Sequence, residues 1–117
     1  MKLVVAIIRT ERLEAVQAAL NESDVYLMTV SDVRGCGRQR GYTEVYRGTE
    51  FQVRLLPKLK LEIAVNEAFV EATVEAVVHA ARTAETGQIG DGKIFVLPLD
   101  DCVRIRTGER GTQAIGP

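Results

Sequence analysis

The sequence contains few of the residues on which metal centres, disulfide frameworks and histidine-based catalysis depend. Its 2 cysteines, Cys36 and Cys102, have neither CxxC spacing nor a histidine cluster nearby, so we expect reduced thiols and no cysteine metal site. The 1 histidine, His79, lies between Val78 and Ala80 in a helical pattern, where a structural role is favoured over acid–base catalysis. Because no nucleophile–base pair is recognisable, the sequence does not predict an enzyme.

Long hydrophobic runs and an excess of one charge are also missing. The apolar run Leu3 to Ile8 is ended by Arg9, so it is too short for a secretion signal or a membrane-spanning helix. The 15 Lys and Arg residues are balanced by 16 Asp and Glu residues, which leaves no global basic field to attract nucleic acid or a membrane surface. The strands also lack the paired aromatic residues that stack RNA bases. We therefore expect a cytoplasmic protein that binds no nucleic acid.

What the chain does contain is an alternation of strand and helix patterns, over a length of 117 residues that suits a single domain, 1–117. The β-branched run Leu3 to Ile8 predicts a strand that is buried on both faces. Thr10 is then predicted to cap a helix that ends near Asn21. A second strand is predicted from Val25 to Val33.

The second half of the chain repeats this alternation. Residues 58–65 alternate between apolar side chains and mostly charged ones, which predicts a strand with one packed face and one charged face. Asn66 is predicted to cap a helix with a broad valine face. An apolar strand from Ile94 to Leu97 is ended by Pro98, and we expect the segment after Gly108 to be loosely ordered.

The predicted order of elements is strand, helix, strand, strand, helix, strand. This order matches the α+β, ferredoxin-like βαββαβ arrangement, an antiparallel four-stranded sheet with both helices on one face. The other face of such a sheet has no cover within the chain. Because the first strand is predicted to be buried on both sides, a homo-oligomer is the simplest way to cover that face.

A long polar loop interrupts this pattern between the second and third strands. It runs from Arg34 to Glu50 and is rich in glycine and arginine, so it is too polar to belong to the core. A compact domain of this size rarely carries so long a connection unless the loop is functional or disordered. We interpret it as a functional loop that contacts a partner.

A second glycine-rich loop precedes the last strand. Gly87, four further residues, Gly92 and Lys93 match part of a P-loop, but Ile94 stands where the magnesium-binding Ser or Thr belongs, and a strand follows instead of a helix. A mononucleotide-hydrolysing P-loop is therefore excluded. Glycines that let backbone N–H groups approach an oxyanion, together with the charge of Lys93, still suit an anion site. The alternative is a tight turn with a solvated lysine.

Several further cations could serve the same anion. They are Arg38, Arg40, Lys58, Arg104 and Arg106. Guanidinium groups bind phosphate in a bidentate manner and an ammonium acts as a point charge, so the set suits a nucleoside triphosphate if it converges in space. The alternative is that each is an ordinary surface charge.

Four motifs together resemble the PII nitrogen-regulatory signal proteins. They are Gly35 to Gly41, Tyr46 to Gly48, Gly90 to Val96 and Arg104 to Glu109. The match covers nearly the whole chain. The resemblance implies a homotrimer of ferredoxin-like subunits that bind ATP or ADP in the clefts between them. It divides the chain into a protruding T-loop at 37–55 that docks on targets, a phosphate-binding loop at 83–93 and a C-terminal segment at 100–117.

The resemblance also implies roles for single residues toward the nucleotide. In the family, residues matching Gly90 to Lys93 wrap the phosphates from one subunit, and those matching Arg104 and Arg106 reach them from its neighbour. Thr29 and Ala64 would hold the adenine. The full set implied for the nucleotide is Thr29, Gly35, Gly37, Arg38, Gln39, Lys58, Glu62, Ala64, Gly90, Asp91, Gly92, Lys93, Arg104 and Arg106, with Glu62 pairing with Lys93 in some nucleotide states.

The resemblance further implies an effector and a target. In the family 2-oxoglutarate binds beside a Mg²⁺ ion held by the ATP phosphates and by the glutamine that matches Gln39, and the lysine that matches Lys58 pairs with its carboxylate. The implied effector residues are Gly37, Gln39, Arg40, Gly41 and Lys58. The implied function is regulation of an ammonium transporter of the Amt class or of a nitrogen-metabolism enzyme. The protein would meet a membrane only through such a transporter. The residues implied to contact the target are Tyr46, Arg47, Thr49 and Phe51.

Two departures from the family pattern leave an alternative open. Phe51 stands where many bacterial members carry the tyrosine that is nucleotidylated, and the loop Ala84 to Ile89 is about three residues longer than usual. Both changes favour a divergent paralogue that binds nucleotides but senses another metabolite or regulates another target. The longer loop touches the phosphate site, so it bears on nucleotide affinity.

Overall fold

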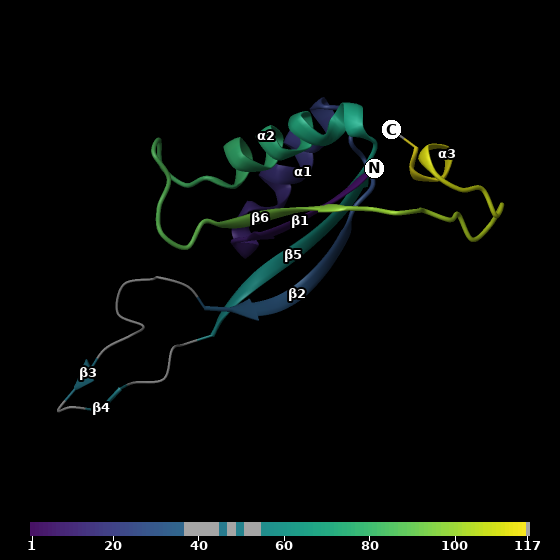
Figure 1. The fold of residues 1–117 in the computed structure, drawn as a ribbon. Coiled ribbons are helices and arrows are strands. Elements are labelled where there is room, and N and C mark those ends of the chain that lie inside the picture. The colour runs from purple at the N-terminus through teal and green to yellow at the C-terminus, as the bar shows by residue number, and fades with distance from the viewer. Residues whose placement is uncertain (37–44, 47–48, 51–54, 117) are drawn as a thin grey trace.

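The computed structural model describes residues 1–36, 45–46, 49–50 and 55–116. Its main feature is a four-stranded sheet in which every neighbouring pair of strands is antiparallel, in the order β2-β5-β1-β6 (Figure 1). The strands are β1 (Lys2–Ile8), β2 (Thr29–Gly35), β5 (Leu56–Val65) and β6 (Gly92–Pro98). The two strands that are central in space, β1 and β5, are therefore far apart in the sequence.

Two helices lie on the same face of this sheet (Figure 1). They are α1 (Leu13–Glu22) and α2 (Val70–Ala81), and a 3₁₀ turn precedes each of them, at Thr10–Arg12 and at Glu67–Phe69. With the strand order, this confirms the α+β, ferredoxin-like arrangement predicted from the sequence.

The core lies between the sheet and the two helices. Every second side chain is buried on β1 and along β5 from Leu59, and for β5 this is the alternation that residues 58–65 predict. The buried apolar residues of the sheet are Val4, Ala6, Ile8, Leu59, Leu61, Ile63 and Val65, and those of the helices are Val16, Leu20, Val77 and Ala81. This layer anchors the strand ends from which the candidate site is built.

The opposite face of the sheet is open in the single chain. Leu3, Val5 and Ile7 are only half-buried, and Phe95, the partner of Val5 on β6, is 50% exposed. The prediction that the first strand is buried on both faces is therefore wrong for one chain, because the residues that the structure describes form no third layer on that side. An apolar surface is left available to another molecule.

Both predicted helix caps are wrong. The Thr10 hydroxyl donates to Glu11 and caps no backbone N–H, because a 3₁₀ turn precedes α1 and its own backbone bonds close the first turn. The Asn66 side chain likewise makes no cap. Its amide donates to the carbonyl oxygens of Gly116, at 2.6 Å, and of Thr112, at 3.3 Å, and so fastens the C-terminal segment to the domain.

The second strand begins at Thr29 instead of Val25. The α1 helix ends with Asp24 at a φ of 62°, and the Val25 N–H donates to the Leu20 carbonyl at 2.9 Å. Residue 25 is thus used to terminate the helix in a left-handed capping turn, and its buried side chain packs against the core. An alternating apolar pattern does not distinguish this buried cap from the start of a strand.

The C-terminal segment is ordered, against the sequence-based expectation. After β6 ends at Pro98 as predicted, Val103 forms an antiparallel bridge with Arg110, and a short helix α3 (Thr112–Ile115) follows (Figure 1). Ile115 is only 6% exposed. The flanking glycines therefore do not loosen the segment, because one apolar side chain and the Asn66 amide hold it.

Most of the predicted T-loop, 37–55, lies outside the described residues. Within it the structure describes two short paired strands, β3 (Val45–Tyr46) and β4 (Thr49–Glu50). Among the helices that the structure describes, none is both long and apolar enough to span a bilayer.

Replacement of Ile115 by alanine tests the attachment of the C-terminal segment. Because the side chain is almost fully buried, Ile115→Ala should lower the free energy of unfolding by about 2 kcal/mol in urea titrations. The matched control is Gln113→Ala on an exposed position of α3, which should change it by less than about 0.5 kcal/mol. Equal effects of the two substitutions would contradict the packing described here.

Candidate functional site

A hollow of about 700 Å³ lies where the ends of the strands meet the glycine loop that leads into β6. We call it the cleft. It is lined by Ile7, Val33, Arg34, Gly35, Cys36, Lys58, Ile89, Gly90, Gly92, Lys93 and Phe95. Its volume lies in the range of small-molecule binding sites, and its apolar walls surround a few polar groups. Of the residues implied for a nucleotide, it brings together Gly35, Lys58, Gly90, Gly92 and Lys93.

Lys58 is the most constrained cation of the cleft. Its side chain is 8% exposed, and its Nζ donates to the Gly90 carbonyl at 2.6 Å. Burial lowers the pKa of the Lys58 ammonium, and the nearby Arg9 lowers it further. The predicted charged face of this strand is therefore not fully solvated, because Lys58 lies inside, fastened to the loop.

Two further cations reach the cleft from other strands. Arg34 comes from β2 and the exposed Lys93 from β6. Together with Lys58 of β5 they place positive charge on three sides of the glycine loop. A guanidinium and two ammonium groups around exposed backbone suit a multiply charged anion.

Gly92 joins the loop to the sheet at a point where no side chain fits. Its φ is 116°, and a Cβ atom built on it would lie 1.7 Å from the carbonyl oxygen of Ile7. The backbone of β6 therefore enters the sheet in direct contact with β1. This close approach places Gly90 and Lys93 at the cleft.

Asp91 does not line the cleft, and its carboxylate is turned to the base of the loop. The Oδ1 atom accepts hydrogen bonds from Arg9 Nε at 3.0 Å and from the Thr83 hydroxyl at 2.6 Å. The Oδ2 atom accepts from the backbone N–H groups of Thr83, at 3.0 Å, and Gln88, at 2.8 Å. Burial alone would raise the pKa of this carboxyl, but these hydrogen bonds outweigh it and hold the pKa well below its usual range.

The residues between Thr83 and Gln88, which belong to the stretch predicted to be longer than usual, form a turn outside the cleft. Ala84 adopts a φ of 59°, and Gly87 one of 80°, so the chain reverses between Thr83 and Gln88. The loop residues that line the cleft are Ile89, Gly90 and Gly92. The residues of the turn thus lie apart from the groups that face an anion.

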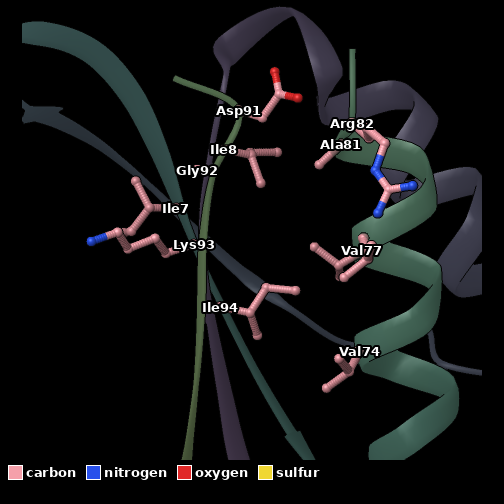
Figure 2. A pocket seen from close by; sticks show the side chains of 11 residues that line it. Ile7, Ile8, Val74, Val77, Ala81, Arg82, Asp91, Gly92, Lys93 and Ile94 are labelled. Carbon is pink, nitrogen blue, oxygen red and sulfur yellow. The ribbon is translucent and has the colours of Figure 1, made fainter. Parts of the chain in front are cut away.

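A smaller hollow of about 310 Å³ lies on the other side of β6, against α2. Figure 2 shows its walls, formed by Ile8, Val74, Val77, Ala81 and Ile94, and shows Lys93 extending away from it. Its surface is mainly apolar. Arg82 and Asp91 also line this smaller hollow, whereas Arg34, Lys58 and Lys93 line the cleft.

Three residues implied for the nucleotide lie elsewhere. Thr29 and Glu62 are neighbours across β2 and β5, and Ala64 lies two residues further along β5. In register, Ala64 is opposite Leu3 and Lys93 is opposite Ile7, so they are separated by about 13 Å along the strand direction. Glu62 is opposite Val5, at the middle of β1, so only Ala64 lies toward the end of the sheet away from Lys93.

Val103 and Ile105 alternate with Arg104 and Arg106 in the sequence, which predicts an extended segment with both arginines on one face. This prediction is wrong. A turn at 105–107 separates them, because the Gly108 N–H donates to the Arg104 carbonyl at 2.7 Å and Gly108 adopts a φ of 73°. The Arg104 guanidinium donates to Glu109 at 2.9 Å and to two carbonyl oxygens of α3. Arg106 is exposed.

The remaining predicted residues lie outside the described part of the chain. They are Gly37, Arg38, Gln39, Arg40, Gly41, Arg47 and Phe51. Tyr46 and Thr49 are described only as backbone partners in the β3–β4 pair.

Sequence reasoning missed Arg9, Thr83 and the cleft-lining role of Arg34. Arg9 directly follows the last residue of β1, where a charge ends an apolar run, and this position was the available signal. Nothing in the spacing of Thr83 and Asp91 shows that a single carboxylate closes the loop.

Two glycine-to-alanine substitutions separate the steric contact of Gly92 with β1 from the strain of its positive φ. Gly92→Ala should lower the free energy of unfolding by on the order of 3 kcal/mol more than Gly108→Ala in urea titrations. Both glycines have a positive φ, but a Cβ at Gly108 meets no atom within 4 Å, so that control measures backbone strain alone. Equal losses would show that contact with β1 is unimportant.

The lowered pKa of Asp91 predicts a pH dependence of stability. A carboxyl whose pKa is depressed on folding contributes stability above its unfolded pKa, about 3.9, and this contribution is lost as pH falls toward the folded value. The stability difference between the natural chain and Asp91→Asn should therefore be largest near neutral pH and shrink below about pH 4. Urea unfolding at several pH values measures it, with the exposed Asp100→Asn as control. A difference that does not change with pH would contradict the charged network.

Comparison with known proteins agrees with this architecture. The family model described as "Nitrogen regulatory protein P-II" matches residues 1–109. A Synechocystis protein named nitrogen regulatory protein P-II is 56% identical over 115 residues, and a Rhizobium etli protein of the same name is 53% identical, each covering 98% of this chain and 100% of its own length. Nitrogen regulatory protein GlnK1 of Methanosarcina mazei is 51% identical over 98% of this chain and 97% of its own. The chain belongs to the P-II family of nitrogen regulatory proteins.

Proposed function

We propose that this chain acts as a homotrimeric signal protein that binds ATP or ADP, with Mg²⁺ and 2-oxoglutarate, between its subunits. In this proposal it regulates an ammonium transporter of the Amt class or a nitrogen-metabolism enzyme through docking of residues 37–55. Its relatives named nitrogen regulatory proteins support the regulatory part.

The observation that carries the nucleotide part is the convergence at the cleft. Lys58, Lys93 and Arg34 surround the backbone of Gly90 and Gly92 in a hollow of about 700 Å³. Glycine has no side chain, so its backbone N–H groups can approach an oxyanion closely, and the cations offset the charge of phosphates. Among the described residues, Thr29, Glu62 and Ala64 do not line this hollow, and Ala64 lies about 13 Å from Lys93 along the strand direction.

The division of the implied set supports a trimer. A second copy could bring its own Thr29, Ala64, Arg104 and Arg106 to the cleft of the first. The open face of the sheet carries Val5, Phe95 and other exposed apolar groups that a partner copy would bury. One homotrimer would therefore both complete the site and bury this face.

Lys58 supports an effector carboxylate at the same place. The Lys58 ammonium is largely buried, and its hydrogen bond goes to the Gly90 carbonyl, which carries no formal charge. A carboxylate that approached it would offer a stronger, charge-assisted partner and would release the loop from Lys58. Gln39 would hold the metal, as the family resemblance implies, and selection of one conformation of the loop around it would decide which targets can dock.

Titration calorimetry with ATP and Mg²⁺, with and without 2-oxoglutarate, tests the proposal. The natural chain should release or absorb heat on binding ATP. Lys93→Ala should weaken ATP binding by about tenfold, and Lys58→Met should remove most of the effect of 2-oxoglutarate, because each loses a charged contact. Absence of nucleotide binding in every condition would overturn the proposal.

A second candidate is a divergent paralogue that binds nucleotide but senses a different metabolite. It is favoured by Phe51, which has no hydroxyl to modify, and by the lengthened turn that follows Thr83. ATP binding that 2-oxoglutarate leaves unchanged would support this candidate over the first.

A further inference from the structure

We propose that Asp91, Thr83 and Arg9 form a clamp that positions Gly90 and Gly92 for anion binding and isolates the cleft from the turn at 84–87. We call these three residues the Asp91 clamp. The inference rests on the proposed function in that the positioned groups serve a nucleotide. It assigns Asp91 a positioning role, because its carboxylate faces the base of the loop and not the cleft.

The first element of the clamp is the closure of the turn by one carboxylate. Thr83 lies on one side of the turn and Gln88 on the other, and backbone N–H groups of both donate to Asp91 Oδ2, at 3.0 and 2.8 Å. The Thr83 hydroxyl adds a bond of 2.6 Å to Oδ1. These bonds hold the two ends of the turn at a fixed separation, and this separation does not depend on the conformation of the residues between them.

The second element is Arg9, which brackets Gly90. Its Nε donates to Asp91 Oδ1 at 3.0 Å, and its Nη2 donates to the Ile89 carbonyl at 2.9 Å. The residues on both sides of Gly90 are therefore fastened to one guanidinium. Arg9 directly follows β1, and the Ile7 carbonyl of β1 is in contact with Gly92. The position of the loop is therefore fixed relative to β1.

The clamp also resolves an electrostatic conflict. A carboxylate next to a phosphate site would repel the ligand, yet Asp91 adjoins Gly90 and Gly92 in the sequence. The ion pair with Arg9, whose side chain and that of Asp91 are each about one-fifth exposed or less, offsets this charge on the side away from the cleft. The negative charge is thus used for structure without facing the anion.

A fixed loop matters because glycine is costly to order. A segment with Gly87, Gly90 and Gly92 has more backbone conformational freedom than a segment without glycine. If the ligand had to order this segment, the loss of conformational entropy would reduce affinity. A loop that is already held before the ligand arrives avoids that loss. The clamp therefore raises affinity without touching the ligand.

The decisive comparison is between Thr83→Val and Thr83→Ser. Valine keeps the shape of threonine but removes the hydroxyl donor, whereas serine keeps the donor. Thr83→Val should weaken ATP binding by about tenfold in calorimetry, as expected for loss of a hydrogen bond to a charged group, and should accelerate amide hydrogen exchange at Gln88, Gly90 and Gly92. Thr83→Ser should restore both, and the thermal unfolding midpoints of the two variants should agree within a few degrees.

Deletion of 84–86 tests the isolation of the cleft. If Asp91 holds both ends of the turn, this deletion should change ATP affinity by less than about twofold, since loop length itself has a small effect. A loss as large as that of Thr83→Val would overturn the isolation.

The outcomes separate the clamp from the proposed function. If Thr83→Val exchanges its loop amides as slowly as the natural chain, the clamp is overturned, whether or not nucleotide binds. If the natural chain binds no nucleotide but Thr83→Val still accelerates exchange, the proposed function fails and the clamp survives as a structural device.

Discussion

The close contact between Gly92 and β1 is the constraint on which the site depends. The absence of a side chain at this one position lets the loop enter the sheet against the carbonyl oxygen of Ile7. From there Lys93 can extend into the cleft while Asp91, one residue earlier, turns to the base of the loop. Two charges of opposite sign, two residues apart, thus act on opposite sides of the same backbone. With a bulkier residue at 92, the strand would have to move away from β1, and both placements would be lost.

Around this contact the chain holds its loop through partners that are distant in the sequence. Lys58 donates to Gly90 from β5, and Arg9 donates to Ile89 and Asp91 from the end of β1. Each of these cations is at the end of a strand whose next inward side chain belongs to the core. Hydrogen bonds from these cations therefore restrain a glycine-rich segment that has little stability of its own. The same arrangement leaves the half-buried Val5 and the exposed Phe95 on the opposite face of the sheet, as part of an apolar surface that is available to another molecule.

The elements could be predicted because their signals are local and regular. Alternation along residues 58–65 and the helical spacing of the valines of α2 follow directly from which side chains face the core. The predictions that failed concern residues whose type does not show which partner their polar groups take. Asn66 and Thr10 have the chemistry of caps, but 3₁₀ turns precede the helices, and the Asn66 amide is used by Gly116. Val25 has the pattern of a strand, yet helix termination uses its backbone. The tail has the glycines of a loose end, yet the Ile115 side chain is buried.

The sequence by itself determined the order and type of the elements, the family and the chemical character of the loop at 87–93, because periodicity and motif spacing are properties of neighbouring residues. Only the tertiary structure decided which cations meet at the cleft and which way each charge points. It set Lys58 inside the domain, separated Arg104 from Arg106 by a turn, and turned Asp91 from the anion site to Arg9 and Thr83. These outcomes depend on strand register and on burial, which arise only when segments that are far apart in the sequence pack together.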